Sequence, residues 1–224
     1  NGEFAKVNIY GKEYSGKALY DVLESYVRKA FFSKDKAEKE KGMDLIWYIW
    51  TAPNSPIYGR HKMATFERYF LDEKEMHHES KNAYYKLIDK PEIADKILKE
   101  FGLDGEHMHI INGHVPVRRI SGESPVKSNG KVIVIDGGFS KTYQSKTGIA
   151  GYTLIFNSHH LALAEHKPFV PEQESTPRVM IVEKMQNRIR VADTDIGRQL
   201  KKRIADLNEL VAAYRGGIIK ENVK

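Results

Sequence analysis

The chain contains 224 residues, and 41% of them are hydrophobic, which is enough apolar surface for a packed core. Its 36 lysines and arginines outnumber its 30 aspartates and glutamates. The resulting formal charge of +6 suits an anionic ligand but is too evenly spread to indicate a nucleic-acid partner. The lack of cysteine excludes disulfides, thiolate metal sites and a cysteine nucleophile, and no apolar run approaches the ~20 residues of a membrane-spanning helix. We therefore expect a globular, cytoplasmic protein without a membrane partner, and a homo-oligomer is left open.

The first third of the chain predicts a strand, a helix and a second strand. Residues 7–10 form a short strand candidate, and Ser15 can cap a helix from Lys17 to about Phe31, whose apolar residues recur on one face. The mixed-sign run 33–42 is typical of a solvated helix end or a mobile loop. Residues 45–50 are apolar throughout, which favours a strand covered on both faces, and an extended loop should follow because Pro53 and Pro56 come next.

That loop carries a cluster of basic residues. The segment N-S-P-I-Y-G-R-H-K-M-A-T-F-E-R-Y-F places Arg60, His61, Lys62 and Arg68 behind a glycine-led turn. Clustered positive charge suits a phosphate, because arginine makes forked, charge-assisted hydrogen bonds to anionic oxygens. A solvated basic turn is an equal alternative. The adjacent histidines at 77 and 78 do not predict a metal site, because neighbouring side chains diverge.

The middle of the chain predicts a packing helix and three strands. The helix runs from Pro91 to about Phe101, since proline fits its first turn and apolar residues share one face. The runs 109–111, 132–135 and 152–156 each adjoin glycine and predict buried strands that deliver polar residues to one rim. Asn129-Gly130 predicts a tight hairpin between strands. Ser158, His159 and His160 match no metal signature.

His114 is the most informative residue of this region. It follows Gly113 where a strand pattern ends, and strand-to-loop junctions often display functional groups. The alternative is a histidine that is hydrogen-bonded locally at a strand end.

The tail from Leu161 predicts a proline-bearing connector, strands at 179–183 and 188–191, and a final helix. Thr194 or Asp195 can cap this helix, its apolar stripe should dock against the main sheet, and Gly216-Gly217 should end it. We therefore expect two parts, residues 1–160 as the main domain portion and residues 161–224 as a strand-strand-helix extension.

Three segments of the chain read I-I-N-G-H-V-P-V, K-S-N-G-K-V-I-V-I-D-G-G-F-S-K-T-Y-Q and T-G-I-A-G-Y-T-L-I-F-N-S. In these segments the chain closely resembles the bacterial class III fructose-1,6-bisphosphatases, which are calcineurin-like metallophosphatases. The resemblance continues through the basic loop and V-A-D-T-D-I-G, so it covers nearly the whole chain. It implies an α/β (α+β) fold that is part of a metallophosphatase β-sandwich flanked by helices, with a small C-terminal α/β extension. It also implies hydrolysis of fructose 1,6-bisphosphate to fructose 6-phosphate and phosphate at a dinuclear centre, typically of Mn²⁺.

The resemblance assigns roles to four residues. His114 falls on the final Gly-His motif of the metallophosphatases, so we expect it to bind one metal ion. Arg60 corresponds to the arginine that holds the substrate phosphate. Tyr143 corresponds to the tyrosine over the metal site, with the later Ala-Gly at Ala150-Gly151. We expect Arg60 and Tyr143 to act in catalysis, and Lys62 to join them in binding the substrate.

Two departures from the family pattern limit these expectations. The family usually has G-R-D-K where this chain has G-R-H-K, so His61 replaces an acid. The Asp-x-His, Gly-Asp-x-x-Asp-Arg-Gly and Gly-Asn-His-Glu motifs, which carry most metal ligands, are expected to precede this chain, which we interpret as a carboxy-terminal portion. The rival hypothesis is a non-catalytic phosphometabolite-binding or interaction module on the same fold. A protein phosphatase would differ only in its substrate.

Overall fold

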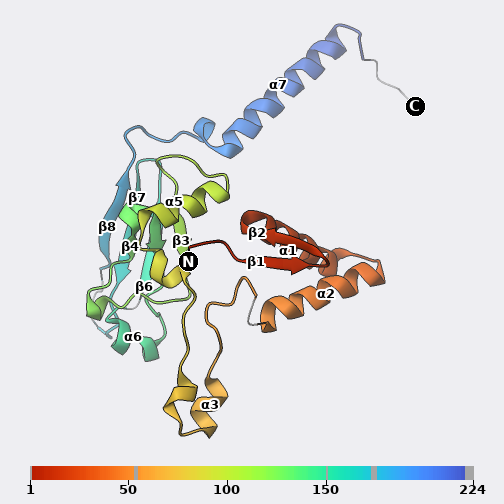
Figure 1. Ribbon diagram of the computed structural model, residues 1–224. Coiled ribbons are helices and arrows are strands. Elements are labelled where there is room, and N and C mark those ends of the chain that lie inside the picture. Colours follow the sequence, from red (N-terminus) through yellow and green to blue (C-terminus); the bar gives the residue numbers. More distant parts are fainter. Residues whose placement is uncertain (1, 53–54, 150, 173–175, 220–224) are drawn as a thin grey trace. The chain divides into compact units, whose positions relative to one another are not determined.

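A computed structural model describes residues 2–52, 55–149, 151–172 and 176–219 (Figure 1). These ranges contain seven α-helices and three small sheets, which confirms the mixed α/β class. The β-sandwich implied by the resemblance stays a prediction. The chain divides into two compact units, one from residues 1–114 and 124–134 and the other from residues 115–123 and 135–224. No helix in the described ranges is both long and apolar enough to cross a membrane.

The first unit begins with a hairpin and a helix, where a single strand and a helix were predicted. β1 (Lys6–Ile9) pairs antiparallel with β2 (Lys12–Ser15), and α1 (Gly16–Phe32) follows directly. Ser15 occupies the N-cap position, but its side chain makes no capping hydrogen bond. The carboxylate of Glu100 instead accepts from the backbone N–H of Lys17 at 2.9 Å, so α1 is capped by a residue distant in sequence.

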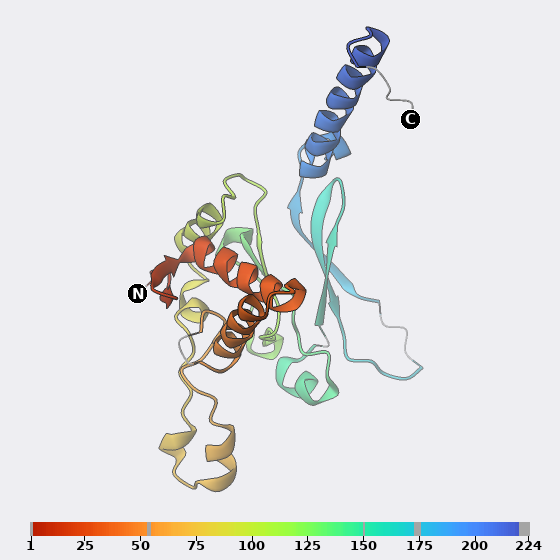
Figure 2. The same cartoon turned by 90° about the vertical axis from the view of Figure 1, so that its right-hand side faces the viewer.

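The predicted strand at 45–50 is wrong, because these residues form the end of α2 (Lys36–Thr51). The mixed-sign run before them is the start of the same helix, capped where the Asp35 carboxylate accepts from the N–H of Glu38 at 2.8 Å. Leu45 packs with Leu19 and Leu23 of α1, whereas the two tryptophans of α2 are exposed. A six-residue apolar run does not by itself distinguish a strand from a helix that is buried on one face only. Figure 2 shows α1 and α2 packed together.

The first unit contains a long loop whose ends, Arg60 and Lys81, form an isolated antiparallel bridge. We call residues 60–81 the excursion. It carries α3 (Thr65–Phe70) and the 3₁₀ helix η1 (Lys74–His77), and Figure 1 draws it as a loop with these short helices at its end. Of the extended loop predicted after residue 52, Pro53 lies outside the described residues, and residues 55–58 form a turn in which the N–H of Tyr58 donates to the carbonyl of Ser55 at 3.0 Å.

The strands of the second sheet follow α4 (Tyr84–Leu87) and α5 (Pro91–Glu100) in the sequence. β3 (Ile110–Asn112) is parallel to β5 (Val132–Val134), and β4 (Val126–Lys127) is antiparallel to β5. Val132 packs with Ala94 of α5, so the predicted packing helix is confirmed. The predicted hairpin is also confirmed, since residues 128–131 connect β4 to β5 with Asn129 in the left-handed region at φ 54°.

The second unit is built on an antiparallel sheet in the order β6 (Gly151–Phe156), β7 (His160–His166), β8 (Arg178–Lys184). The strand at 152–156 is therefore paired in a different sheet from β3 and β5, and the expected shared rim stays a prediction. β7 was predicted to be a connector. Its residues 161–164 are all buried, so the strand lacks the polar alternation that would have revealed it. β6 and β7 are hydrogen-bonded to each other, although the predicted boundary at residue 160 falls at the start of β7. The division of the chain into residues 1–160 and 161–224 stays a prediction.

The C-terminal region contains one strand and one helix. β8 confirms the strand at 179–183, but the strand at 188–191 is wrong. The chain there enters the 3₁₀ helix η4 (Val191–Asp193), because Asp193 accepts hydrogen bonds from the backbone and side chain of Arg190. α7 (Asp195–Arg215) begins as predicted, with the Thr194 hydroxyl accepting from Gly197 N–H at 3.1 Å. The residues of its apolar stripe are exposed, and their expected docking against the main sheet stays a prediction.

Candidate functional site

Backbone hydrogen bonds join the two ends of the excursion next to the Arg60–Lys81 bridge, and we call this part the neck. The N–H of His61 donates to the carbonyl of Ser80 at 3.0 Å, and the N–H of Asn82 donates to the carbonyl of Gly59 at 2.8 Å. These bonds flank the bridge between Arg60 and Lys81. The backbone at Arg60 is therefore fixed although the residue lies in a long loop.

Glu79 lies next to this neck and binds the predicted basic cluster. Its side chain is only 7% exposed, and its carboxylate accepts from the N–H of Ala64 at 2.8 Å. It also pairs with the guanidinium of Arg60, and the guanidinium of Arg68 lies 3.7 Å away. The N–H of Ala64 is the main cause that lowers the pKa of the Glu79 carboxyl, and Arg60 lowers it further against the opposing effect of desolvation. The carboxylate is thus held in its ionised form.

Sequence analysis missed Glu79 because it stands in a polar run that is typical of a solvated surface. Its role depends on a partner 19 residues away, and no local period encodes that contact. The only signal in the sequence was the nearby excess of arginine and lysine, because a buried charged side chain needs a partner of opposite charge.

The three predicted cations differ in their availability to a ligand. The side chains of Arg60 and Arg68 are 45% and 56% exposed, so each guanidinium keeps donors that face solvent. Lys62 instead donates to the carbonyl of Met76 at 2.7 Å and lies 3.8 Å from the carboxylate of Glu67. Arg60 and Arg68 are therefore the stronger candidates for binding an anion, and Lys62 is occupied by the excursion itself.

The structure explains the histidine that replaces an acid in the G-R-H-K segment. Nδ1 of His61 accepts from the backbone N–H of Ser80 at 2.7 Å, and the Ser80 hydroxyl lies 2.8 Å from the same nitrogen. A nitrogen that accepts from a backbone N–H carries no proton, so the ring proton is on Nε2. An aspartate carboxylate can accept the same N–H. His61 therefore serves as the local acceptor at the neck.

His77 is used within the excursion rather than as part of a metal pair. Its Nε2 lies 2.8 Å from the carbonyl of Leu71 and 3.1 Å from that of Glu67. The Nε2–H donates to these oxygens and joins α3 to η1. The ring of His78 lies 6.1 Å from that of His61.

His114 lies at a strand-to-loop junction, as predicted. β3 ends at Asn112, and His114 has a φ of 69°, which is uncommon for a residue with a Cβ. Its ring is exposed and has no hydrogen-bond partner within the described part of the chain. The alternative, a histidine hydrogen-bonded at a strand end, is not observed in the described part of the chain. Its predicted role as a metal ligand stays a prediction.

A metal centre is not assembled by the described residues alone. Among the described residues, no group of three or more His, Cys, Asp or Glu side chains lies close enough together to hold an ion. His114 is therefore at most one ligand of a centre that needs donors from elsewhere. The predicted Mn²⁺ stays a prediction.

Tyr143 projects from α6 (Lys141–Thr147) in the second unit, and its side chain is exposed. Gly138 lies directly against it, since a Cβ added there would come within 2.7 Å of the Tyr143 Cβ. Gly138 has a φ of 75°, and its N–H donates to the Asp136 carboxylate at 2.7 Å. Arg60 and His114 belong to the first unit, so their predicted meeting with Tyr143 stays a prediction. Ala150 lies outside the described residues.

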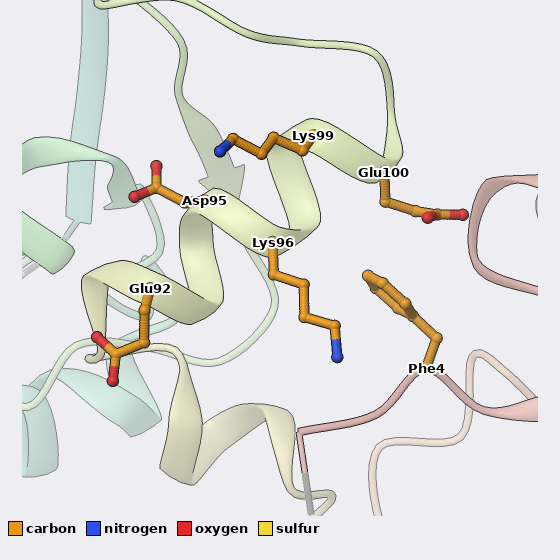
Figure 3. Close-up of a pocket in the computed structure, with 6 residues that line it drawn as sticks. All are labelled: Phe4, Glu92, Asp95, Lys96, Lys99 and Glu100. Atoms are coloured by element: carbon orange, nitrogen blue, oxygen red, sulfur yellow. The ribbon is translucent and has the colours of Figure 1, made fainter.

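An open pocket on α5 offers charged groups but no site (Figure 3). Figure 3 shows charged side chains of this helix around it, with Phe4 opposite. Three of these groups are already used: Lys96 donates to the carbonyl of Gly2 at 2.8 Å, Asp95 pairs with Lys131, and Glu100 caps α1. The excursion is therefore the better candidate for binding an anion.

Comparison with known proteins identifies relatives along the whole chain. Residues 1–216 match the family described as Firmicute fructose-1,6-bisphosphatase. A class 3 fructose-1,6-bisphosphatase of Bacteroides fragilis is 50% identical over 231 residues, and one of Clostridium acetobutylicum is 51% identical over 232 residues. Each alignment covers 100% of this chain but 35% of the relative, so the chain spans about a third of the length of these proteins. No solved structure gives a significant match. The resemblance stated from the sequence is confirmed, and the chain belongs to the Firmicute fructose-1,6-bisphosphatase family.

Proposed function

We propose that the protein hydrolyses fructose 1,6-bisphosphate to fructose 6-phosphate and phosphate in the cytoplasm, as a step of gluconeogenesis, and that this chain supplies part of its substrate site. The observation that carries the proposal is Arg60, whose backbone is fixed at the neck while its side chain remains 45% exposed. The similarity to class 3 fructose-1,6-bisphosphatases supports the choice of substrate.

Arg60 suits this role because a phosphate monoester presents several anionic oxygens to a planar donor. A guanidinium can bind two of these oxygens at once, which fixes the orientation of the phosphate as well as its position. Lys62 adds positive charge near Arg60, and the hydroxyl of Tyr143 can donate to an oxygen of the phosphoryl group. These groups would bind and orient the substrate and stabilise charge that develops on the phosphoryl oxygens.

His114 is proposed as a ligand of one Mn²⁺ ion in the full-length protein. Its exposed ring and the lack of a hydrogen-bond partner among the described residues leave a nitrogen available for coordination. When bound, a pair of such ions supplies hydroxide from water at neutral pH and neutralises charge on phosphate oxygens. The described residues do not complete that centre, and its other ligands would come from the rest of the full-length protein.

A second candidate function is a binding module for phosphorylated metabolites that has lost catalysis. The remaining metal ligands of the full-length protein distinguish the two: their presence favours the enzyme, and their replacement favours the module. The two functions share the anion site of the excursion. They differ in phosphate release, which only the enzyme produces.

Replacement of Arg60 in the full-length protein tests the proposal. Arg60→Lys is expected to lower kcat/KM for fructose 1,6-bisphosphate nearly as much as Arg60→Ala, because lysine keeps the charge and loses the fork. Lys74→Ala is the matched control, since it removes an exposed cation of the same excursion outside the cluster. A lysine variant with nearly wild-type kcat/KM would show that the excursion neck is an ordinary solvated basic turn.

A further inference from the structure

The excursion concentrates its ionic contacts on a single carboxylate. Glu79 interacts with Arg60, Arg68 and the N–H of Ala64, and its side chain is far less exposed than either arginine. The two guanidinium groups therefore lie against the same carboxylate, although the two arginines are eight positions apart in the sequence. Two like charges are held together here by the acid between them.

The Glu79 carboxylate is held in place by its own backbone, so it can restrict the positions of the two arginine side chains. The next residue, Ser80, donates its N–H to Nδ1 of His61, and its carbonyl accepts from the N–H of His61. Lys81 then forms the bridge to Arg60. The backbone of Glu79 is thus anchored at the neck. Arginine side chains are long and flexible, so contact with a fixed acid reduces the freedom that they would otherwise lose on binding a ligand.

The contacts leave donors for a ligand. Arg60 uses Nη1 for Glu79, and a guanidinium has five N–H donors in all. Arg68 lies 3.7 Å from the carboxylate, and its Nη2 also lies 3.3 Å from the carbonyl of His77. With one negative and two positive charges, the group keeps a net positive charge that favours an anion.

We propose that Glu79 is a positioning residue that holds Arg60 and Arg68 as a paired-guanidinium site for a phosphate group of the substrate. The inference rests on the proposed function, which assigns Arg60 to phosphate binding, and it adds Arg68 and Glu79 to that site. Glu79 touches the arginines and not the reacting atoms. Its effect should therefore appear mainly in KM and in the affinity for inorganic phosphate.

Glu79→Gln in the full-length protein tests this role. Glutamine keeps the shape of the side chain and an oxygen that can accept from Ala64 N–H, but it removes the charge that pairs with the arginines. We expect KM for fructose 1,6-bisphosphate and the inhibition constant of inorganic phosphate to rise by about tenfold, the scale of one lost charge-assisted hydrogen bond, with a much smaller change in kcat. Arg68→Ala should raise both constants in the same way.

Glu75→Gln is the matched control, because it makes the same charge change on an exposed residue of η1. It should leave both constants unchanged. Glu79→Asp keeps the charge on a shorter arm and should give intermediate values, and it serves as the second variant if Glu79→Gln does not fold by circular dichroism. A fall in kcat with unchanged KM, or tighter phosphate binding in Glu79→Gln, would overturn the positioning role.

The outcomes separate this inference from the proposed function. If Arg60→Lys lowers kcat/KM while Glu79→Gln and Arg68→Ala match the Glu75→Gln control, the inference fails and the proposed function stands. If the Arg60 variants also match wild-type protein, the excursion does not bind substrate and the proposed role of Arg60 fails as well.

Discussion

Gly42→Ala should loosen the packing of α1 against α2, and it tests the helix that the sequence did not predict. A Cβ at Gly42 would lie 2.5 Å from the carbonyl oxygen of Tyr26, 2.6 Å from the Cβ of Ala30 and 2.7 Å from its N. Two of these atoms belong to the backbone, so no rotation of a side chain relieves the contact. Overpacking of this kind costs about 1–3 kcal/mol.

The intrinsic preference for helix acts in the opposite direction. Alanine favours a helix interior over glycine by about 1 kcal/mol. With an overpacking cost in the upper part of its range, the net destabilisation should therefore be roughly 1–2 kcal/mol. Amide hydrogen exchange of peptides from α1 and α2, measured by mass spectrometry, should become about tenfold faster, because 1.4 kcal/mol corresponds to a factor of ten.

Lys39→Ala provides the control, since it changes an exposed position of the same helix without a packing contact. Its exchange should remain close to that of the original chain. Slower exchange in Gly42→Ala, as helix preference alone would give, would show that α1 and α2 do not meet at this glycine.

Two further predictions concern pH and metal binding. Because the pKa of the Glu79 carboxyl is lowered in the folded chain, its contribution to stability is present above the ordinary pKa of 4.5 and is lost as the pH falls through the lower folded value. The exchange protection of the Ala64 amide should follow this titration in the original chain and not in Glu79→Gln. The 224-residue chain alone should neither release phosphate from fructose 1,6-bisphosphate nor bind two Mn²⁺ ions, because the described residues assemble no cluster of three ligands. Calorimetric titration that shows two bound ions, together with turnover, would place the catalytic centre within these residues.

The elements that the sequence predicted well are those with clear ends and one buried face. α1, α5 and α7 each combine an amphipathic pattern with a start signal, and the Asn-Gly hairpin has its own turn chemistry. The errors fall where burial removes the pattern. β7 is buried along residues 161–164 and shows no alternation, and residues 45–50 are apolar whether they form a strand or the end of a helix.

The candidate site was predicted only in part, for a related reason. Clustering in the sequence was enough to select Arg60 and Arg68, and the end of a strand pattern was enough to select His114. Glu79 required the fold, because the neck brings it to Arg60 across 19 residues. The role of His61 also depended on the fold, since its acceptor function becomes visible only when Ser80 lies beside it.

The central claim is that the full-length protein is a fructose-1,6-bisphosphatase in which His114 holds one metal ion. Phosphate release from fructose 1,6-bisphosphate with Mn²⁺, measured together with metal content by mass spectrometry for wild-type protein and His114→Ala, tests it most directly. We predict one phosphate released per substrate molecule by the wild-type protein. His114→Ala should lose one bound ion and several orders of magnitude of activity, because water cannot replace an imidazole ligand without displacing the reacting groups. Wild-type protein that releases no phosphate, or a His114→Ala variant that keeps two ions and full turnover, would contradict the account.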